Sequence, residues 1–145
     1  MINSLLWASL GTLGFGLVFN ANKNKLLYIL IGGFLNYLTY ALIYKLTSNI
    51  FYSSLFSACI TYLYSSLMAR VTKSPAIIYI LTGLIPIVPG GALFYTMQNF
   101  VLGNENLAIK YASIAAQVIL GTASGIALFS VTINLIKDLK HNFNH

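Results

Sequence analysis

Charged residues divide the chain into five uncharged, mostly apolar runs. These runs cover residues 1–22, 26–44, 46–69, 74–104 and 111–136. Each run is close to or above the roughly 20 residues that a helix needs to cross about 30 Å of hydrocarbon. The runs are too continuous for the alternating strands of a barrel, and backbone groups in lipid must pair within their own segment, so helices are the expected form.

We therefore predict an all-α integral membrane protein with five transmembrane helices. Residues 1–145 form a single transmembrane domain, because the gaps between the runs are too short to hold another one. The expected spans are approximately 2–20, 26–44, 48–69, 75–102 and 111–136.

The composition supports a membrane protein. Of 145 residues, 58% are hydrophobic and 7% are charged, whereas about 25% charged residues is usual in a soluble domain. The net charge of +6 is spread over short gaps, and no basic cluster alternates with aromatic residues, so nucleic-acid binding is not expected. The single cysteine, Cys59, cannot form an intramolecular disulfide and is expected to be a packing residue.

The basic residues predict an orientation. Six of them fall on one side of the predicted membrane and two on the other: Lys23, Lys25, Arg70, Lys73, Lys137 and Lys140 against Lys45 and Lys110. By the positive-inside rule the N-terminus lies outside and the C-terminus in the cytoplasm, which fits a multi-pass protein of the plasma membrane. If the fourth run were a re-entrant loop, the ratio would fall to five against three. No basic residue precedes the first run, so we expect that run to be retained as a span.

The fourth run contains an element that predicts a broken helix. Pro86 and Pro89 each remove a backbone donor, and Gly90 and Gly91 admit backbone angles that are closed to other residues. As one straight helix the run would be about 46 Å long, well beyond the hydrocarbon thickness. We predict that the fourth transmembrane helix is broken at this Pro-x-x-Pro-Gly-Gly element.

A break inside the membrane predicts a binding site. Unpaired amides and carbonyls at such a break can hold an ion or a polar substrate, and the positive end of a half-helix beginning near Gly91 favours a carboxylate. Tyr95 and Gln98 follow within about two turns and are expected to add polar contacts. The alternative is a proline kink that serves only helix packing, since Pro and Gly are common in membrane helices.

The other spans show mainly packing features. Gly121 and Gly125 form a small-xxx-small pattern, and Gln117 lies one turn earlier on the same face, so the last helix is expected to approach a neighbour closely. The third run carries a polar stripe of Ser53, Ser57, Thr61 and Ser65. Such stripes, and the mid-span Asn36, are more often interhelical contacts than substrate ligands.

Catalytic chemistry is not expected. The chain has no cluster of His, Cys or carboxylates for a metal and no acid–base pair, so we predict no enzyme activity, no metal and no cofactor. A proton-coupled carrier usually keeps an ionisable residue inside the membrane. Here a partner would have to supply it, or Glu105 would have to dip inward, although Glu105 is expected to be a solvated loop residue.

The sequence also resembles a known family. Residues 83–97 with Gly103, residues 14–20, and the pair Gly32 and Gly33 resemble the threonine/serine exporter family, specifically its C-terminal half or small subunit. The resemblance covers nearly the whole chain, and Pro86, Pro89, Gly90, Gly91 and Tyr95 occupy motif positions. Where Gly91 stands the family commonly has a small hydroxyl residue, so one substrate contact is missing here.

The resemblance implies a function and a partner. Members export threonine and serine by secondary transport driven by an ion gradient, and split two-subunit members are linked to dicarboxylates. The larger half of the family is absent from this chain, which implies a separate larger subunit beside the small polar substrate and the lipid bilayer; a homo-oligomer is a further option. The alternative from another class is a non-transporting membrane scaffold or assembly partner.

Overall fold

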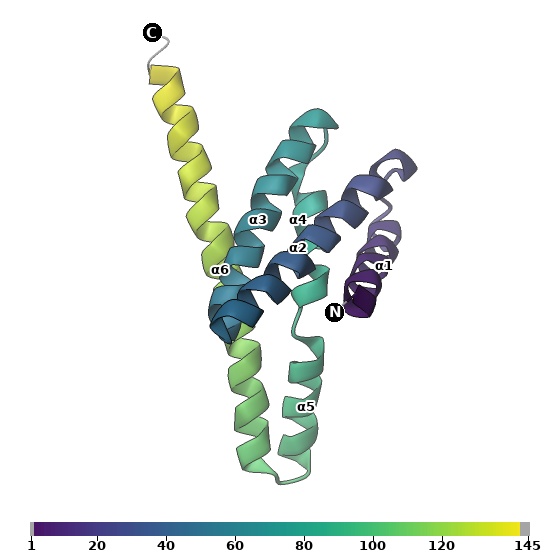
Figure 1. The fold of residues 1–145 in the computed structure, drawn as a ribbon, viewed down its shortest axis with the longest axis vertical. Coiled ribbons are helices and arrows are strands. Elements are labelled where there is room, and N and C mark those ends of the chain that lie inside the picture. The colour runs from purple at the N-terminus through teal and green to yellow at the C-terminus, as the bar shows by residue number, and fades with distance from the viewer. Residues whose placement is uncertain (1, 143–145) are drawn as a thin grey trace.

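The structure is a computed structural model that describes the backbone of residues 2–142 and the side chains of residues 3–133. All regular elements in this part of the chain are helices (Figure 1). The α-helices are α1 (Ile2–Val18), α2 (Leu26–Thr47), α3 (Ile50–Val71), α4 (Ala76–Leu84), α5 (Gly90–Val101) and α6 (Glu105–Asn142). Two short 3₁₀ helices are η1 (Lys23–Lys25) and η2 (Ile85–Ile87).

The helix ends follow from local sequence. α2 stops at Ser48, which adopts a left-handed conformation with φ 52°, and the Asn49 side chain then accepts a hydrogen bond from the Tyr52 amide to begin α3. Pro75 stands directly before α4, where its missing amide costs nothing. Gly103, with φ 75°, makes the turn between α5 and α6.

Three helical stretches are long and apolar enough to cross a membrane: Lys23–Thr47, Ile50–Val71 and Glu105–Ile133. A fourth candidate consists of two helices, Ala76–Ile87 and Gly90–Val101, which are bent by 52° at the break between them. Both a broken span and a re-entrant loop have this geometry. α1 is apolar but shorter, with 17 residues. The chain is therefore an all-helical membrane protein with three to four candidate spans, and the five crossings stay a prediction.

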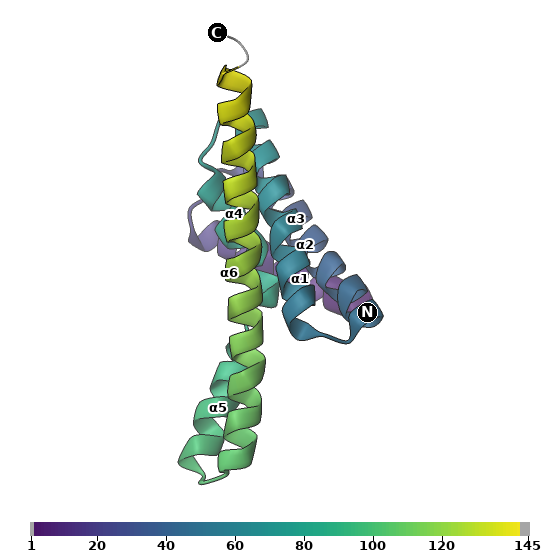
Figure 2. The ribbon, with the colours of Figure 1, turned by 90° about the vertical axis from the view of Figure 1, so that its left-hand side faces the viewer.

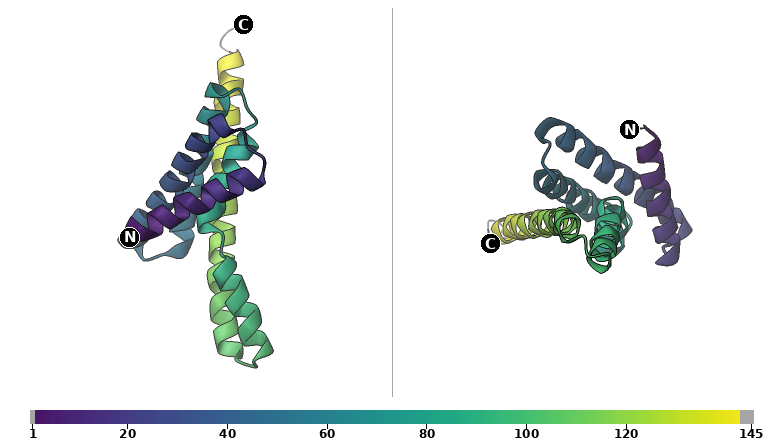
Figure 3. Two further views of the ribbon diagram at one scale, coloured as in Figure 1. Left: turned by 90° about the vertical axis from the view of Figure 1, so that its right-hand side faces the viewer. Right: turned by 90° about the horizontal axis from the view of Figure 1, so that it is seen from below.

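Helices α1 to α4 form the body of the molecule. α3 packs between α2 and α6, and α1 lies on the side of the body opposite α6 (Figure 3). Glycines allow the close contacts, because a Cβ atom added at Gly33 would collide with Thr12 of α1, and one added at Gly83 would lie 2.9 Å from the Thr61 Cγ2 atom. The core of the body thus depends on backbones approaching closely at small residues.

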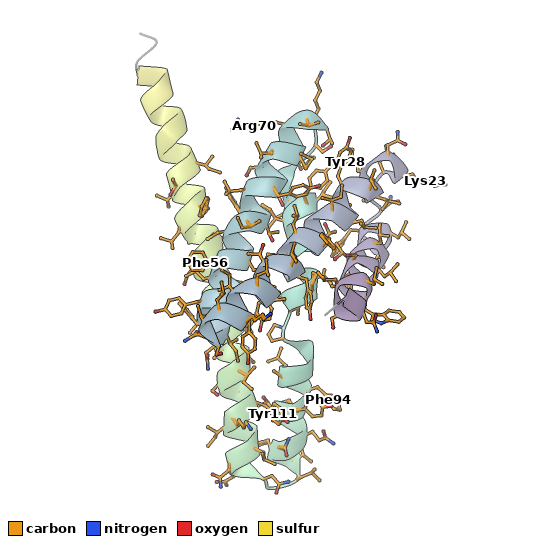
Figure 4. The ribbon with its side chains drawn as sticks, in the orientation of Figure 1. Lys23, Tyr28, Phe56, Arg70, Phe94 and Tyr111 are labelled. Carbon is orange, nitrogen blue, oxygen red and sulfur yellow. The ribbon has the colours of Figure 1, made fainter. Side chains whose placement is uncertain are left out.

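Helices α5 and α6 form a hairpin that extends away from the body (Figure 2). α5 packs mainly against α6, and none of its residues is buried. The rings of Tyr95 and Tyr111 meet with a centroid distance of 5.2 Å, and Figure 4 shows Phe94 and Tyr111 on this hairpin. One side of α5 is therefore free of contacts with the rest of the described chain.

The register between α3 and α6 locates the hairpin. Both helices run in the same direction, with Gly121 beside Phe51 and Gly125 beside Leu55. Glu105 lies 16 residues before Gly121, so the hairpin extends about 24 Å past the start of α3 at 1.5 Å per residue. The bend of the α4–α5 pair falls where the hairpin leaves the body.

Candidate functional site: the break between α4 and α5

The two prolines stand on either side of the bend. Pro86 lies in η2 and Pro89 is the residue directly before α5. Each removes the amide that would bond the carbonyl four residues earlier. The 3₁₀ geometry compensates, because the Ile85 amide donates to the Thr82 carbonyl and the Val88 amide donates to the Ile85 carbonyl at 3.2 Å. The carbonyls that the prolines would leave unpaired are thus satisfied.

Other backbone groups at the break have no partner. The Gly90 amide donates to the Val88 carbonyl at 2.8 Å, and the Leu93 amide donates to the Pro89 carbonyl at 3.0 Å. Between them, the amides of Gly91 and Ala92 donate to no acceptor among the described residues, and the carbonyls of Pro86 and Ile87 accept from no donor there. The break therefore presents both free donors and free acceptors.

Gly90 and Gly91 are open to their surroundings. Both are exposed, and a Cβ atom added to either would meet nothing within 4 Å. Neither has a positive φ, so neither uses the backbone freedom that is particular to glycine. A larger residue would therefore fit at either position within this chain. The remaining physical reason for glycine is that it leaves space for a group that approaches from outside the chain.

A groove of about 370 Å³ lies between the break and α6. Its lining is almost entirely apolar and consists of Leu84, Ile87, Val88, Pro89, Val118, Ile119, Thr122, Ala123 and Ile126. The Thr122 hydroxyl donates within α6, to the carbonyls of Val118 and Ile119. Thr122 follows Gly121, which lies beside Phe51 near the start of α3, so the groove and the break lie at the level where the hairpin leaves the body.

The six residues predicted for the site do not all meet there. Pro86, Pro89, Gly90 and Gly91 lie at the break, whereas Tyr95 packs beside Tyr111 on the hairpin. Gln98 is about 10 Å further along α5 than Gly91 at the helical rise, where it lines an apolar hollow together with Phe94 and Met97. Roles for Tyr95 and Gln98 in binding stay predictions.

The predicted packing glycines lie against α3. A Cβ atom at Gly121 would lie 2.6 Å from the Phe51 carbonyl oxygen, and one at Gly125 would collide with the Leu55 carbonyl. The buried Cys59 thiol donates a hydrogen bond to the Gly125 carbonyl oxygen at 3.6 Å. Gln117, one turn before Gly121, is half-buried.

A polar junction inside the body joins residues that the sequence analysis considered separately. The Asn36 Nδ2 atom donates to the Thr61 Oγ1 atom at 2.7 Å, and the Ser57 hydroxyl donates to the Asn36 carbonyl at 2.9 Å. All three residues are fully buried or nearly so. The sequence showed that Asn36 lies in the middle of a span and that the third run carries a polar stripe. It did not show that the two pair with each other.

Metal ligands do not gather in the part of the chain whose side chains are described: no three His, Cys, Asp or Glu residues lie close enough to hold an ion together. The candidate features for a function are accordingly the break, the groove and the polar junction. All three belong to apolar helices near the middle of the uncharged runs.

Apolar helices of membrane-spanning length define a helical membrane protein, and an interruption with free backbone groups is a feature of many membrane transporters. The sequence profile of the family described as Threonine/Serine exporter, ThrE, matches residues 4–132. The chain belongs to this family, and the family suggested by the sequence resemblance is confirmed. No curated protein and no solved structure matches the chain significantly.

Proposed function

We propose that this chain is the small membrane subunit of a secondary exporter of amino acids such as threonine or serine, or of small carboxylates, and that it works with a larger membrane subunit. Membership of the exporter family supports export of a small molecule across a membrane. That family transports rather than catalyses, which is consistent with a protein that is not an enzyme.

The observation that carries the proposal is the pair of free amides at the start of α5. The amides of Gly91 and Ala92 have no acceptor among the described residues, and nothing within 4 Å occupies the Cβ direction of Gly91. Free amides and the positive end of a helix dipole bind a carboxylate without any cationic side chain. We assign the substrate carboxylate to these two amides.

Between the two substrate classes, the break favours an amino acid. The free carbonyls of Pro86 and Ile87 precede the free amides by a few residues, and carbonyl oxygens attract an ammonium group. A second carboxylate would face these oxygens, and the run around the break has no Lys or Arg between Lys73 and Lys110 to receive it. A zwitterion is thus matched at both of its charged groups.

A partner is needed because the break lies on the surface of this chain. Lipid cannot pair free backbone groups, which persist in membranes only where they line a cavity or are buried in protein. α5 is uncovered on the side away from α6. We propose that the larger subunit covers the break and completes the substrate path.

The orientation belongs to the same proposal. Figure 4 shows Lys23 and Arg70 at the same end of the body, the end at which α1 joins α2 and α3 joins α4. Lys45 lies in the last turn of α2 and Lys110 near the start of α6, at the opposite ends of the predicted spans. With five crossings in the plasma membrane, the positive-inside rule puts the end with Lys23 and Arg70 in the cytoplasm and the N-terminus outside.

The test compares two glycine substitutions in cells that contain the larger subunit. Gly91→Leu crowds the free amides, whereas Gly14→Leu, at another open glycine in α1, is a matched control. After a load of threonine, serine or succinate, we expect Gly91→Leu to abolish efflux with normal membrane levels and Gly14→Leu to leave it unchanged. Equal efflux from both variants would contradict a site at the break.

The same cells test the scaffold alternative. If this chain only assembles or holds another membrane protein, the larger subunit alone should transport at the full rate. If the proposal is right, efflux requires both chains, and it is lost when either is deleted.

A further inference from the structure

The polar junction has one atom whose bonding is incomplete. Asn36 is 0% exposed, and its Oδ1 atom has no hydrogen-bond partner, while its Nδ2 atom donates to Thr61. A buried acceptor without a partner costs about 1–3 kcal/mol. Such groups are rare in folded proteins, which indicates that something outside the described chain bonds to this oxygen.

Reversing the amide does not remove the problem. The Thr61 hydroxyl already donates to the Ser57 carbonyl at 2.9 Å, so it can accept from Nδ2 but has no second proton to give to Oδ1. Turning the amide by 180° would place two oxygens face to face and leave Nδ2 unpaired. The orientation with a free Oδ1 atom is therefore the stable one.

The helices around this atom exclude bulk water and offer oxygen atoms. Gly83 of α4 packs against Thr61, and its Cβ direction also points toward the Gly32 backbone of α2 at 4.0 Å. The neighbouring hydroxyls come from Ser57 and Thr61, which are at most 1% exposed. α2, α3 and α4 thus enclose a small set of neutral oxygens.

The charges near the junction narrow the choice of ligand. α2, α3 and α4 contain no Asp, Glu or His, and the one carboxylate among residues 3–133, Glu105, is exposed at the far end of the hairpin. A proton therefore has no ionisable side chain to bind in these helices. Neutral carbonyl oxygens at membrane depth hold Na⁺ in broken-helix transporters, and the Asn36 Oδ1 atom is an oxygen of the same neutral carbonyl type.

We propose that Asn36 Oδ1, together with the hydroxyl oxygens of Ser57 and Thr61, binds a Na⁺ ion. The site is independent of the break, because it lies on α2 and α3, whereas the break lies between α4 and α5. Its binding of Na⁺ does not require that the chain exports anything.

The primary test measures binding of radioactive Na⁺ to the purified full chain in lipid nanodiscs, with choline as the inert replacement cation. We expect saturable Na⁺ binding that Asn36→Leu weakens by about tenfold or more, the loss of one charge-assisted contact. Asn36→Asp keeps the size and an oxygen and should bind Na⁺ at least as well as the wild type, which guards against misfolding of the leucine variant.

Ser54→Ala is the matched control. Ser54 is also on α3, is 0% exposed and has an unpaired hydroxyl, but it faces Gly121 of α6 rather than Asn36. Its removal should leave Na⁺ affinity unchanged. Absence of saturable binding in the wild type, an unchanged affinity in Asn36→Leu, or an equal loss in Ser54→Ala would each overturn the proposal, and Asn36 Oδ1 would then bond to an internal water.

Discussion

Alanine at Gly125 should open the contact between α3 and α6. A Cβ atom there would collide with the Leu55 carbonyl and would lie 3.0 Å from the Ala58 Cβ atom. Backbone atoms cannot rotate away, so the two helices must separate. Overpacking of this kind costs about 1–3 kcal/mol, and because α6 stays helical when it moves away, the better helix propensity of alanine does not offset that cost.

The single cysteine gives a direct assay. The Cys59 thiol is buried in the same contact, beside the Gly125 carbonyl, so a small thiol reagent labels it only when α3 and α6 separate. A cost of 1–3 kcal/mol should raise the labelling rate about 5- to 150-fold. Gly14→Ala, at an open glycine of α1, should leave the rate unchanged. Equal rates in the two variants would refute the inferred packing of α6 on α3.

Three further predictions concern other parts of the fold. Tyr64→Phe removes the hydrogen bond from the Tyr64 hydroxyl to an α2 carbonyl at 2.7 Å and should cost about 1 kcal/mol in detergent unfolding, whereas Tyr62→Phe should be neutral. Pro89→Ala restores an amide at the bend, and spin labels at Ile77 and Phe100 should then move apart as the helix straightens; an unchanged distance would show that the prolines do not maintain the bend. A tag at the C-terminus should resist labelling from outside intact cells, and labelling there would reverse the proposed topology.

The spacing of charges predicted the helices because charges are costly in hydrocarbon. The run 26–44 matches α2 to within a few residues, since Lys25 and Lys45 stand at the interfaces on either side. Local rules also located the interruption at Pro89, because a missing amide affects only its own turn. These features depend on neighbours in sequence, so a single chain reveals them.

Features that depend on distant parts of the chain were not predictable. Asn36 and Thr61 form a hydrogen bond although they are 25 residues apart and lie in different helices. The sequence does not show which face of α2 packs against which face of α3. Gln98 was assigned to the break by its spacing along a helix, but α5 departs at 52° from the helix before it. The spacing predicted the distance between Gln98 and Gly91 along the helix, but not which residues surround Gln98.

The one-sided packing of α5 determines how this part of the molecule can move. α5 is attached to the body at the break and rests on α6 alone, so it behaves as a lever arm with its pivot at Pro89. With 12 residues it is about 18 Å long, and a swing of roughly 10° would displace its far end by about 3 Å. Such a swing turns the free amides of Gly91 and Ala92, which lie next to the pivot, by only the same roughly 10°, so nearly all of the displacement falls on the far end of α5 and not on the break.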